Sequence, residues 1–533
     1  MIPTKQRISQ LFLNQRLIGT VAIPVMLVFA VMAVYGQVGG FDFVQYDDYA
    51  NLFRNPHIDT DTFPNLGYFW THSQEGQGYY VYRPVVYTVS ALLAYATRLS
   101  HARQISGAGD SQLDPLAFHL LSVVVHAANT VLAYFVSRWL LRKSSSECVV
   151  DNRVIDLSCF GGALFFAIHP VQVEAVAWAT GLTELLGTLF SLTAVWLYLV
   201  FLSDERGRVY SAILYSLASI SFFLAVFSKP EAVVTPAVIL LVAVVLFRKP
   251  VLKVSIGVAP WFALSLAFIL LTSSVELTDM RQKTVPFIDR FSVAGDALVG
   301  HLSHSLWPTN LAIDYGLTPA YVLGQKFGHA MWLVLLAVLL SVWFAAKKSR
   351  GTGVALGIII VTLLPVLGFV PFRFQSYSTV ADRYMYFPMF GVTMLLSGIL
   401  VRFHRPQIVA VYAAVLIFLA GLCSIQLQTW RTSFTLFAQA TSVNPNSWLS
   451  WLDLGLSYGY ENDLPHAAEC FERTLQLNPD QPTAEASLGV AYLRMNRPEE
   501  AVIHLQRANA ELPNTPYILG YLAQAATAAN SAR

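Results

Sequence analysis

Charged residues are scarce in this sequence, and their scarcity sets the class of protein. Asp, Glu, Lys and Arg make up 12% of the 533 residues, whereas hydrophobic residues make up 55%. A water-soluble chain of this length cannot cover its surface with so few charges, so we predict an integral membrane protein. The formal net charge of +2 is not the basic excess that nucleic-acid binding requires, so we exclude that class.

Cysteine is also rare, and its spacing carries no chemistry. The four cysteines have no metal-type spacing, and we interpret them as packing residues. A removable leader is not expected either. The apolar segment 17–38 follows Lys5, Arg7 and Arg16, but it is too long and lacks a small-residue cleavage site. It is the first predicted membrane span.

Apolar runs of membrane-spanning length recur as far as residue 430. Basic clusters next to these runs mark cytoplasmic loops, and all clusters lie on one side if the chain crosses about eleven times. The expected spans are 17–38, 116–141, 154–169, 182–202, 210–227, 231–247, 252–272, 328–346, 353–371, 384–401 and 407–428. This odd number places the N-terminus inside and the C-terminal tail outside.

Two outer loops are long enough to contain helices of their own. The first loop, 39–115, includes an apolar stretch from Pro84 to Leu99. If this stretch crossed the membrane, the basic clusters would no longer all lie on the cytoplasmic side. We therefore expect it to lie along the membrane surface. The second loop contains a helix near 291–307 with Asp296, His301 and His304, charges that disfavour a lipid-facing span.

The tail repeats with a period of 34 residues, which is typical of tetratricopeptide (TPR) helix pairs. Leu454, Gly455, Tyr458, Ala467, Phe471 and Pro479 are matched by Leu488, Gly489, Tyr492, Ala501, Leu505 and Pro513. Phe437, Ala440 and Pro445 fit the second helix of a preceding half-repeat. We predict an all-α chain with a transmembrane domain over 1–429 and a TPR α-solenoid over 430–533, of about 2.5 repeats plus a cap.

Ionisable residues gather on the predicted outer side. Such residues at membrane depth are expensive and therefore suggest a functional site. The set comprises Asp47, Asp48, Arg54, Arg83, His169, Glu174, Glu184, Lys229, Glu231, Asp314, Asp382 and Arg383. A carboxylate such as Asp47 or Asp48 can take a proton from a hydroxyl, and Arg83 or Arg383 can hold a phosphate leaving group.

Structural interpretations of the same residues stay open. Asp47 and Asp48 can be solvated loop acids or helix caps. Glu174 and Glu184 can be acids at helix starts, and Lys229 can extend to the membrane interface. His119 and His126 lie seven residues apart on one helical face, where at least one is expected to make an interhelical hydrogen bond.

Together these segments resemble the transmembrane and TPR-containing O-mannosyltransferases, and more broadly the GT-C glycosyltransferases. The matching stretches run in order along nearly the whole chain: FDFVQYDDYANLFRNPHI, YRPVV, FHLLSVVVHAANTVLAYFV, GGALFFAIHPVQVEAVAWATGLTELLGTLF, SKPEAVVTPAVILL, LWPTNLAIDY and ADRYMYFPMFG, followed by the repeats. Each stretch alone is weak, but the shared order is specific.

The resemblance implies an inverting GT-C enzyme that moves a mannose-like sugar from a polyprenyl-phosphate carrier to an acceptor hydroxyl, with protein Ser/Thr as the expected acceptor. It implies catalytic roles for Asp47, Asp48 and, as a second acid, Glu184, with Asp47 preferred as the base. We assign the donor and its phosphate to the remaining set: Arg83, Arg383, Arg54, Lys229, His169 and Glu174. Neither a cofactor nor a metal is expected.

The chain has fewer repeats and shorter loops than the animal members, which suggests a bacterial protein with a periplasmic tail; in a eukaryote the tail would face the ER lumen. The expected partners are the carrier lipid and an acceptor protein or peptide bound by the TPR domain. Two other functions compete. One is an oligosaccharide polymerase or ligase acting on lipid-linked glycans, although such enzymes place their large outer loop late in the sequence. The other is a non-enzymatic TPR scaffold.

Overall fold

The computed structural model describes residues 17–60, 62–75, 80–99, 113–144, 150–203, 207–276 and 285–531, and these fall into two compact units. The first unit contains the described residues of 1–41, 47–311 and 317–428. The second contains 429–531 together with two short loop segments, Asp42–Tyr46 and Ala312–Gly316. The sequence had assigned those two segments to the transmembrane domain.

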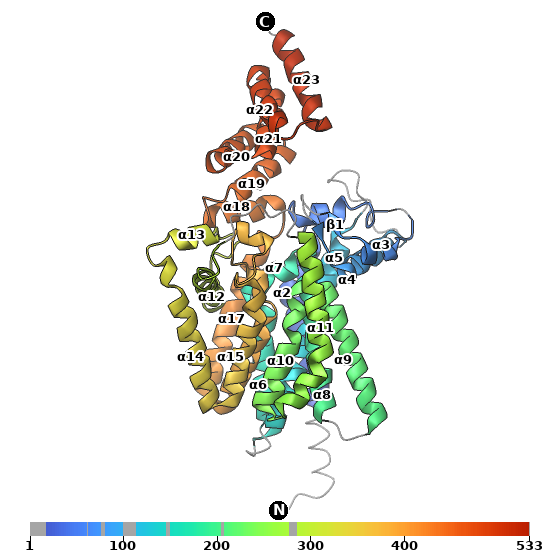
Figure 1. Cartoon of the computed structure of the whole chain (residues 1–533), viewed down its shortest axis with the longest axis vertical. Coiled ribbons are helices and arrows are strands. Elements are labelled where there is room, and N and C mark those ends of the chain that lie inside the picture. Colours follow the sequence, from blue (N-terminus) through green and yellow to red (C-terminus); the bar gives the residue numbers. More distant parts are fainter. Residues whose placement is uncertain are drawn as a thin grey trace, which may run out of the picture. The chain divides into compact units, whose positions relative to one another are not determined.

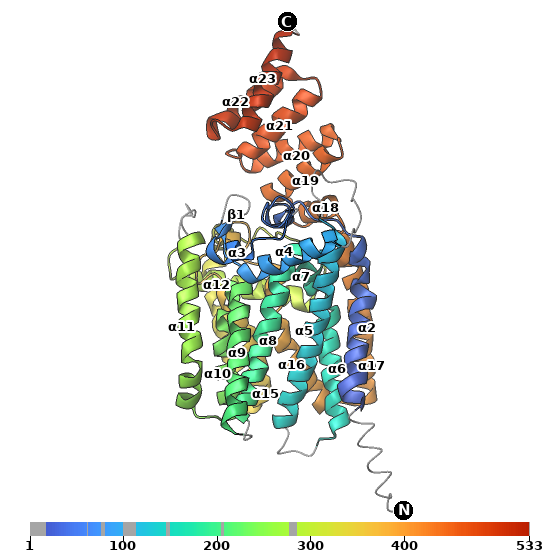
Figure 2. The same cartoon turned by 90° about the vertical axis from the view of Figure 1, so that its right-hand side faces the viewer.

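The first unit is a bundle of helices that run side by side (Figures 1 and 2). Its α-helices are α2 (Ile23–Tyr35), α3 (Leu66–Thr71), α4 (Pro84–Leu99), α5 (Pro115–Ser144), α6 (Asn152–Ile168), α7 (Val173–Ala177), α8 (Leu182–Ser203), α9 (Arg208–Ser228), α10 (Thr235–Leu241), α11 (Val251–Glu276), α12 (Arg290–Leu306), α13 (Pro319–Gly324), α14 (Trp332–Lys348), α15 (Arg350–Leu363), α16 (Pro388–Arg402) and α17 (Pro406–Thr429).

Short 3-10 and π segments extend or link these helices. They are η1 (Ile18–Ala22), η2 (Gly36–Gly40), η3 (Tyr49–Phe53), η5 (Pro170–Gln172), η6 (Ala179–Gly181), η7 (Pro230–Val234), η8 (Val242–Leu246), η10 (Gly328–Ala330), η11 (Leu364–Val366), η12 (Arg373–Ser376) and η13 (Asp382–Met385). The described strands are β1 (Gln74–Glu75) and β2 (Tyr80–Val81), which pair antiparallel.

Apolar helices cover all eleven predicted spans. Among the described residues, seven helices are long and apolar enough to cross a membrane, and α6 with α7 makes an eighth if this pair, bent by 52°, counts as one span. The other three ranges are shorter apolar helices: Pro230–Leu246, Arg350–Val366 and Pro388–Arg402. The chain is therefore an integral membrane protein. Which end of the bundle faces the cytoplasm stays a prediction.

Close helix contacts in the bundle depend on small residues. A Cβ atom on Gly162 of α6 would lie 2.6 Å from the backbone oxygen of Thr393 in α16, so a larger residue there would push the two helices apart. The faces turned away from the core are apolar. For example, Leu333, Leu336 and Leu340 of α14 are all exposed, as expected for side chains solvated by lipid.

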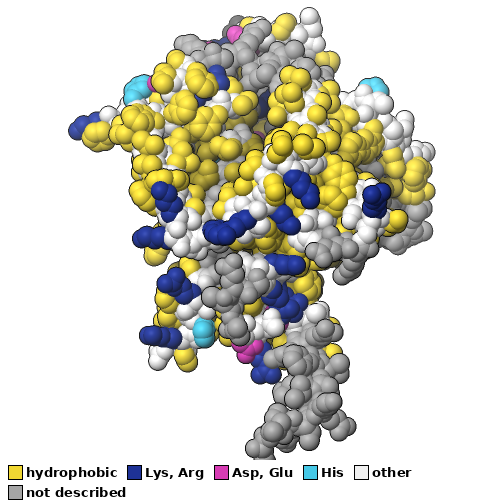
Figure 3. Space-filling view, turned by 60° about the horizontal axis from the view of Figure 1, so that its bottom comes forward, with side chains coloured by type: hydrophobic (Ala, Val, Ile, Leu, Met, Phe, Trp, Pro, Cys, Tyr) yellow, Lys and Arg dark blue, Asp and Glu magenta, His cyan; other side chains and the backbone are white. Residues whose placement is uncertain are grey.

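The two ends of the bundle differ in charge and in covering. At one end, which Figure 3 turns toward the viewer, Lys and Arg side chains gather and acidic ones are sparse. At the other end α4 lies across the bundle helices (Figure 2) and packs against α5, α8 and α9. This is the orientation predicted for Pro84–Leu99. We call this the α4 end.

The second unit consists of successive packed helix pairs, and its described residues contain no strand. Its helices are α18 (Ser433–Val443), α19 (Trp448–Tyr460), α20 (Leu464–Leu477), α21 (Pro482–Arg494), α22 (Pro498–Glu511) and α23 (Pro516–Ser531). The glycines of the repeat allow each pair to touch, because a Cβ on Gly455 would lie 2.7 Å from the ring of Phe471. The predicted TPR pattern is confirmed, and α18 occupies the position predicted for the second helix of a preceding half-repeat.

Candidate functional site

The acidic pair after the first span comes at the start of the first loop, directly before η3. Asp48 is completely buried, and its Oδ1 accepts hydrogen bonds from the backbone N–H of Thr180 (2.8 Å) and from its hydroxyl (2.6 Å). Thr180 lies in η6, directly before α8. Asp48 therefore fixes the first loop against the start of α8, and these bonds occupy one of its carboxylate oxygens.

Asp47 is half-buried and lies in a charged environment. Burial raises the pKa of Tyr87 on α4, Arg83 opposes that rise, and the Asp47 carboxylate adds to it. Tyr87 in turn donates a hydrogen bond to Asn51 Oδ1 at 3.0 Å. Asp47 and Arg83 are therefore both close enough to act on one phenol. The structure thus separates the two aspartates, because Asp48 is engaged internally and Asp47 is the more accessible carboxylate.

The second acid of the sequence analysis, Glu184, is buried at the start of α8 and forms an ion pair with Lys229. The Lys229 ammonium also lies 3.9 Å from Glu231. Lys229 follows the last residue of α9. Burial lowers its pKa to about 8, Glu231 opposes this shift, and the positive charges of Arg383 and Arg83 add to it. Lys229, Arg83 and Arg383 are therefore near one another.

Arg383 is held from several sides. Its backbone N–H donates to Glu174 Oε2 at 3.0 Å, and its guanidinium pairs with the same carboxylate. The guanidinium carbon lies 4.2 Å from the ring centroid of Phe374, 4.9 Å from that of Tyr384 and 5.6 Å from that of Trp178. Aromatic faces and a buried carboxylate fix this cation in one orientation.

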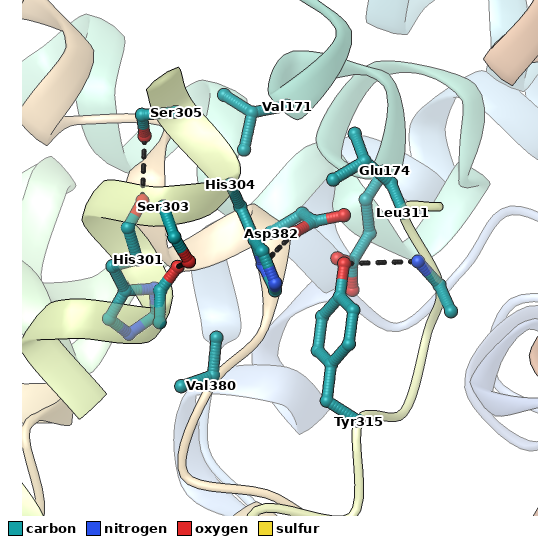
Figure 4. A network of polar contacts seen from close by, with 12 residues as sticks. Val171, Glu174, His301, Ser303, His304, Ser305, Leu311, Tyr315, Val380 and Asp382 are labelled. Carbon is teal, nitrogen blue, oxygen red and sulfur yellow. Dashed lines mark hydrogen bonds and ion pairs between the residues drawn. The ribbon is translucent and has the colours of Figure 1, made fainter. Parts of the chain in front are cut away.

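Two histidines of α12, His301 and His304, lie beside the ion pair of Glu174 and Arg383 (Figure 4). His304 Nδ1 is 3.3 Å from Asp382 Oδ1, and Figure 4 shows the imidazole turned toward that carboxylate. The His301 side chain is buried one turn away, where burial and the neighbouring His304 lower its pKa to about 3. His301 is therefore neutral at physiological pH. Its backbone oxygen accepts a hydrogen bond from the hydroxyl of Ser305 at 2.8 Å.

Two predicted phosphate-binding residues do not join the cations. His169 Nε2 donates to the backbone oxygen of Ser305 at 3.1 Å, and its Nδ1 accepts from the backbone N–H of Val171 at 3.3 Å. Nδ1 therefore holds the bend between α6 and α7, and Nε2 ties this bend to α12. Arg54 is exposed at the end of η3. The other predicted members of the set, Arg83, Lys229, Arg383 and Glu174, are brought together.

His126 makes the interhelical hydrogen bonds that the sequence predicted for at least one histidine of α5. Its Nε2 donates to Ala167 O at 3.0 Å, which leaves Nδ1 to accept from the Tyr386 hydroxyl at 2.8 Å. Asn129 Nδ2 donates to the same hydroxyl at 3.2 Å. This network joins α5, α6 and the residue that follows η13, and it packs these segments together.

Sequence reasoning missed the residues that hold the charged groups in place. Thr180, Trp178 and Phe374 were not singled out, although Trp178 and Thr180 lie in one of the stretches that carry the resemblance, because their importance comes from contacts between segments far apart in the chain. For Glu174 and Arg383 the separation is 209 residues. Among the described residues no group of three or more His, Cys, Asp or Glu side chains is arranged to hold a metal ion.

Comparison with known proteins gives matches to both parts of the chain. A tetratricopeptide-repeat family model matches residues 460–525. The mouse protein O-mannosyl-transferase TMTC3 is 24% identical over 449 residues, which cover 76% of this chain and 46% of that protein. Human TMTC3 is 23% identical over 454 residues, covering 76% of this chain and 47% of that protein. The chain thus spans about half the length of these relatives.

Among solved structures, the ArnT crystal structure from Cupriavidus metallidurans with undecaprenyl phosphate aligns over 95% of this chain and 78% of that chain. The sequence identity is 11% and the TM-score is 0.33, which is too low to define a common fold.

Proposed function

We propose that this chain is a membrane glycosyltransferase that moves a mannose-like sugar from a polyprenyl-phosphate carrier to a hydroxyl group, with protein Ser or Thr as the acceptor. One observation carries the proposal. Asp47, a half-buried carboxylate, shares the α4 end of the bundle with three cations, Arg83, Lys229 and Arg383. A base beside cations at the end of a membrane bundle suits transfer from a lipid phosphate.

The proposed reaction is a single displacement with inversion at the anomeric carbon. Asp47 takes the proton of the acceptor hydroxyl as its oxygen forms a bond to the anomeric carbon. The bond from that carbon to the phosphate oxygen breaks, and its electron pair leaves with the polyprenyl phosphate. Arg83, Lys229 and Arg383 offset the negative charge that develops on the leaving group. The products are the glycosylated acceptor and the carrier phosphate.

The other acids take supporting roles in this scheme. Asp48 positions the loop through Thr180, which keeps Asp47 next to α4. Glu184 and Glu174 each pair with one cation, Lys229 and Arg383 respectively. A buried carboxylate partner keeps a cation charged and oriented until the substrate phosphate arrives. Glu184 is therefore proposed as a positioning residue, in place of the catalytic role that the resemblance implied.

The comparisons support the choice of sugar and acceptor, because the similar relatives are named protein O-mannosyl-transferases. The TPR unit supports a protein or peptide acceptor, since TPR surfaces bind polypeptides. We propose that the α4 end and the TPR unit both face the extracytoplasmic side, because the basic clusters that mark cytoplasmic loops lie at the other end.

The proposal is tested with proteoliposomes supplied with a radiolabelled mannosyl-phosphoryl-polyprenol and a Ser/Thr-rich acceptor peptide. Wild-type protein should transfer label to the peptide. Asp47→Asn should reconstitute equally well and lose transfer by at least a hundredfold, because a general base contributes roughly 10²–10⁴-fold. Full transfer in Asp47→Asn would refute the assignment of the base. If the wild type transfers no sugar from any tested glycosylated lipid, whatever its chain length and sugar, the proposal that this chain is a transferase is refuted.

A further inference from the structure

A pocket lies beside Lys229, between α8, α15, η7 and the segment from η13 into α16. It is lined by Gly187, Thr188, Ser191, Lys229, Glu231, Ala232, Thr362, Val366, Tyr384, Phe387 and Pro388. The proposed reaction assigns no role to this pocket beyond Lys229 at its edge.

The lining combines hydroxyl groups with a carboxylate. Thr188 and Ser191 lie one turn apart on α8, and Thr362 faces the same space from α15. The Thr235 hydroxyl lies 3.1 Å from Ser191 Oγ and donates to the backbone oxygen of Ala232 at 2.7 Å, so Ser191 Oγ keeps a lone pair that can accept a hydrogen bond from a ligand hydroxyl. Glu231 contributes the carboxylate, and 27% of its side chain is exposed. Several hydroxyl partners and an acceptor that can bind two hydroxyls at once suit a polyhydroxylated ligand.

Apolar and aromatic surfaces complete the lining. Tyr384 and Phe387 present rings, and Pro388 and Val366 add aliphatic surface. A sugar ring has hydroxyls at its edge and C–H groups on its faces, so it matches both kinds of lining. A polyprenyl tail does not match, because it would leave the hydroxyls and the Glu231 carboxylate without water or a hydrogen-bond partner.

The position of Lys229 indicates where a phosphate attached to a sugar in this pocket would lie. Its ammonium is 5.7 Å from the ring centroid of Tyr384, so the cation and the aromatic wall belong to the same site. A glycosyl group in the pocket would place its anomeric phosphate next to Lys229 and the other two cations.

We infer that this pocket holds the glycosyl group of the lipid-linked donor and that Glu231 selects the sugar by accepting hydrogen bonds from its hydroxyls. The inference rests on the proposed function. It adds a recognition site to it, in which Thr188 and Ser191 bind further hydroxyls and Glu231 determines specificity without touching the reacting bond.

The test compares two lipids on the purified, reconstituted protein: polyprenyl phosphate without sugar and the corresponding mannosyl-phosphoryl-polyprenol. Dissociation constants for both are measured for wild type, Glu231→Gln and Thr188→Val. Thr193→Val is the matched control. Thr193 is on the same helix, its hydroxyl donates to Leu189 O at 2.7 Å, and it does not line the pocket.

The wild type should bind the mannosylated lipid more tightly than the bare carrier. Glu231→Gln and Thr188→Val should reduce that preference about tenfold each, since one hydrogen bond to a charged or buried polar group is worth roughly this factor. Thr188→Val should bind the bare carrier as wild type does, and Glu231→Gln should lose more affinity for the mannosylated lipid than for the bare carrier. Thr193→Val should retain the full preference.

Three results would overturn the inference or its premise. If the wild type binds neither lipid, the proposed function fails. If the wild type binds the carrier but Glu231→Gln and Thr188→Val keep the wild-type preference, the pocket does not hold the sugar. If Glu231→Gln weakens the binding of both lipids equally, Glu231 acts through Lys229 and the phosphate, and its role in sugar selection is refuted.

Discussion

The carboxylate of Glu184 is paired with the ammonium of Lys229, which joins the first turn of α8 to the segment after α9. Both side chains are largely buried, with 6% and 13% exposed. Removing one partner of a buried pair leaves the other charge uncompensated, whereas replacing both with apolar groups is often neutral. This difference separates the pair's effect on stability from its effect on the substrate.

Glu184→Gln should therefore destabilise the folded bundle by roughly 3 kcal/mol. The double variant Glu184→Leu/Lys229→Met should recover most of that loss and still bind polyprenyl phosphate poorly. Unfolding midpoints in detergent and carrier affinities give the two readouts. A double variant with wild-type carrier affinity would show that Lys229 does not contact the phosphate.

Carrier binding should depend on pH through Lys229. Its pKa is lowered to about 8, chiefly by burial, so the ammonium is mostly charged at pH 7 and loses its proton as the pH rises through 8. The neighbouring charges are Glu184, Glu231, Glu174, Arg83 and Arg383. Affinity for mannosyl-phosphoryl-polyprenol should fall between pH 7 and pH 9.

Lys229→Arg is the control for this pH dependence, because a guanidinium stays protonated over this range. The variant should bind with a nearly flat profile. Equal losses of affinity in wild type and Lys229→Arg on raising the pH would mean that another group titrates.

Alanine substitutions at Asp47 and Asp48 should differ in their effect on the stability of the folded protein. Asp48→Ala removes the acceptor for two hydrogen bonds from Thr180 and should cost roughly 3 kcal/mol, because buried donors are left without partners. Asp47→Ala, at a half-buried position, should change the unfolding free energy by less than about 1 kcal/mol. Thermal unfolding in detergent compares them. A larger loss for Asp47→Ala than for Asp48→Ala would reverse the roles we assign.

Adding a single methyl group at Gly187 should displace Lys229. A Cβ at this position would lie 2.8 Å from Lys229 Cβ, which is close to the Lys229 backbone and cannot swing away. Gly187→Ala gains about 1 kcal/mol of helix propensity but must shift Lys229. Stability should change little while carrier affinity falls several-fold. Gly398→Ala on α16, where a Cβ meets nothing within 4 Å, is the control and should bind normally.

The helices of this fold could be predicted from the sequence because each depends on local periodicity. Apolar length located the eleven apolar helices of the bundle, and the 34-residue repeat located the TPR pairs. The resemblance and the charges together indicated Asp47, Arg83, Lys229 and Arg383 as neighbours. Arg54 and His169 were included on the same grounds, but the structure leaves Arg54 exposed and engages both ring nitrogens of His169.

The partners of the charged residues could not be predicted. Whether Asp48 binds Thr180 or substrate, and whether Glu184 is an acid or the counter-ion of Lys229, depends on how α8 and the first loop pack. The bend after α6 and the 3-10 turn η13 bring Glu174 and Arg383 together. A single sequence contains no periodic signal for such contacts.

The central claim is that a carrier phosphate binds among Arg83, Lys229 and Arg383, next to Asp47. The most direct measurement is an experimental structure of the protein in a lipid nanodisc with bound polyprenyl phosphate. We predict that phosphate oxygens lie within about 3 Å of nitrogens of at least two of these cations, with Asp47 facing the phosphate from the side of the first loop. A phosphate bound at the basic end of the bundle, away from all three cations, would contradict the account.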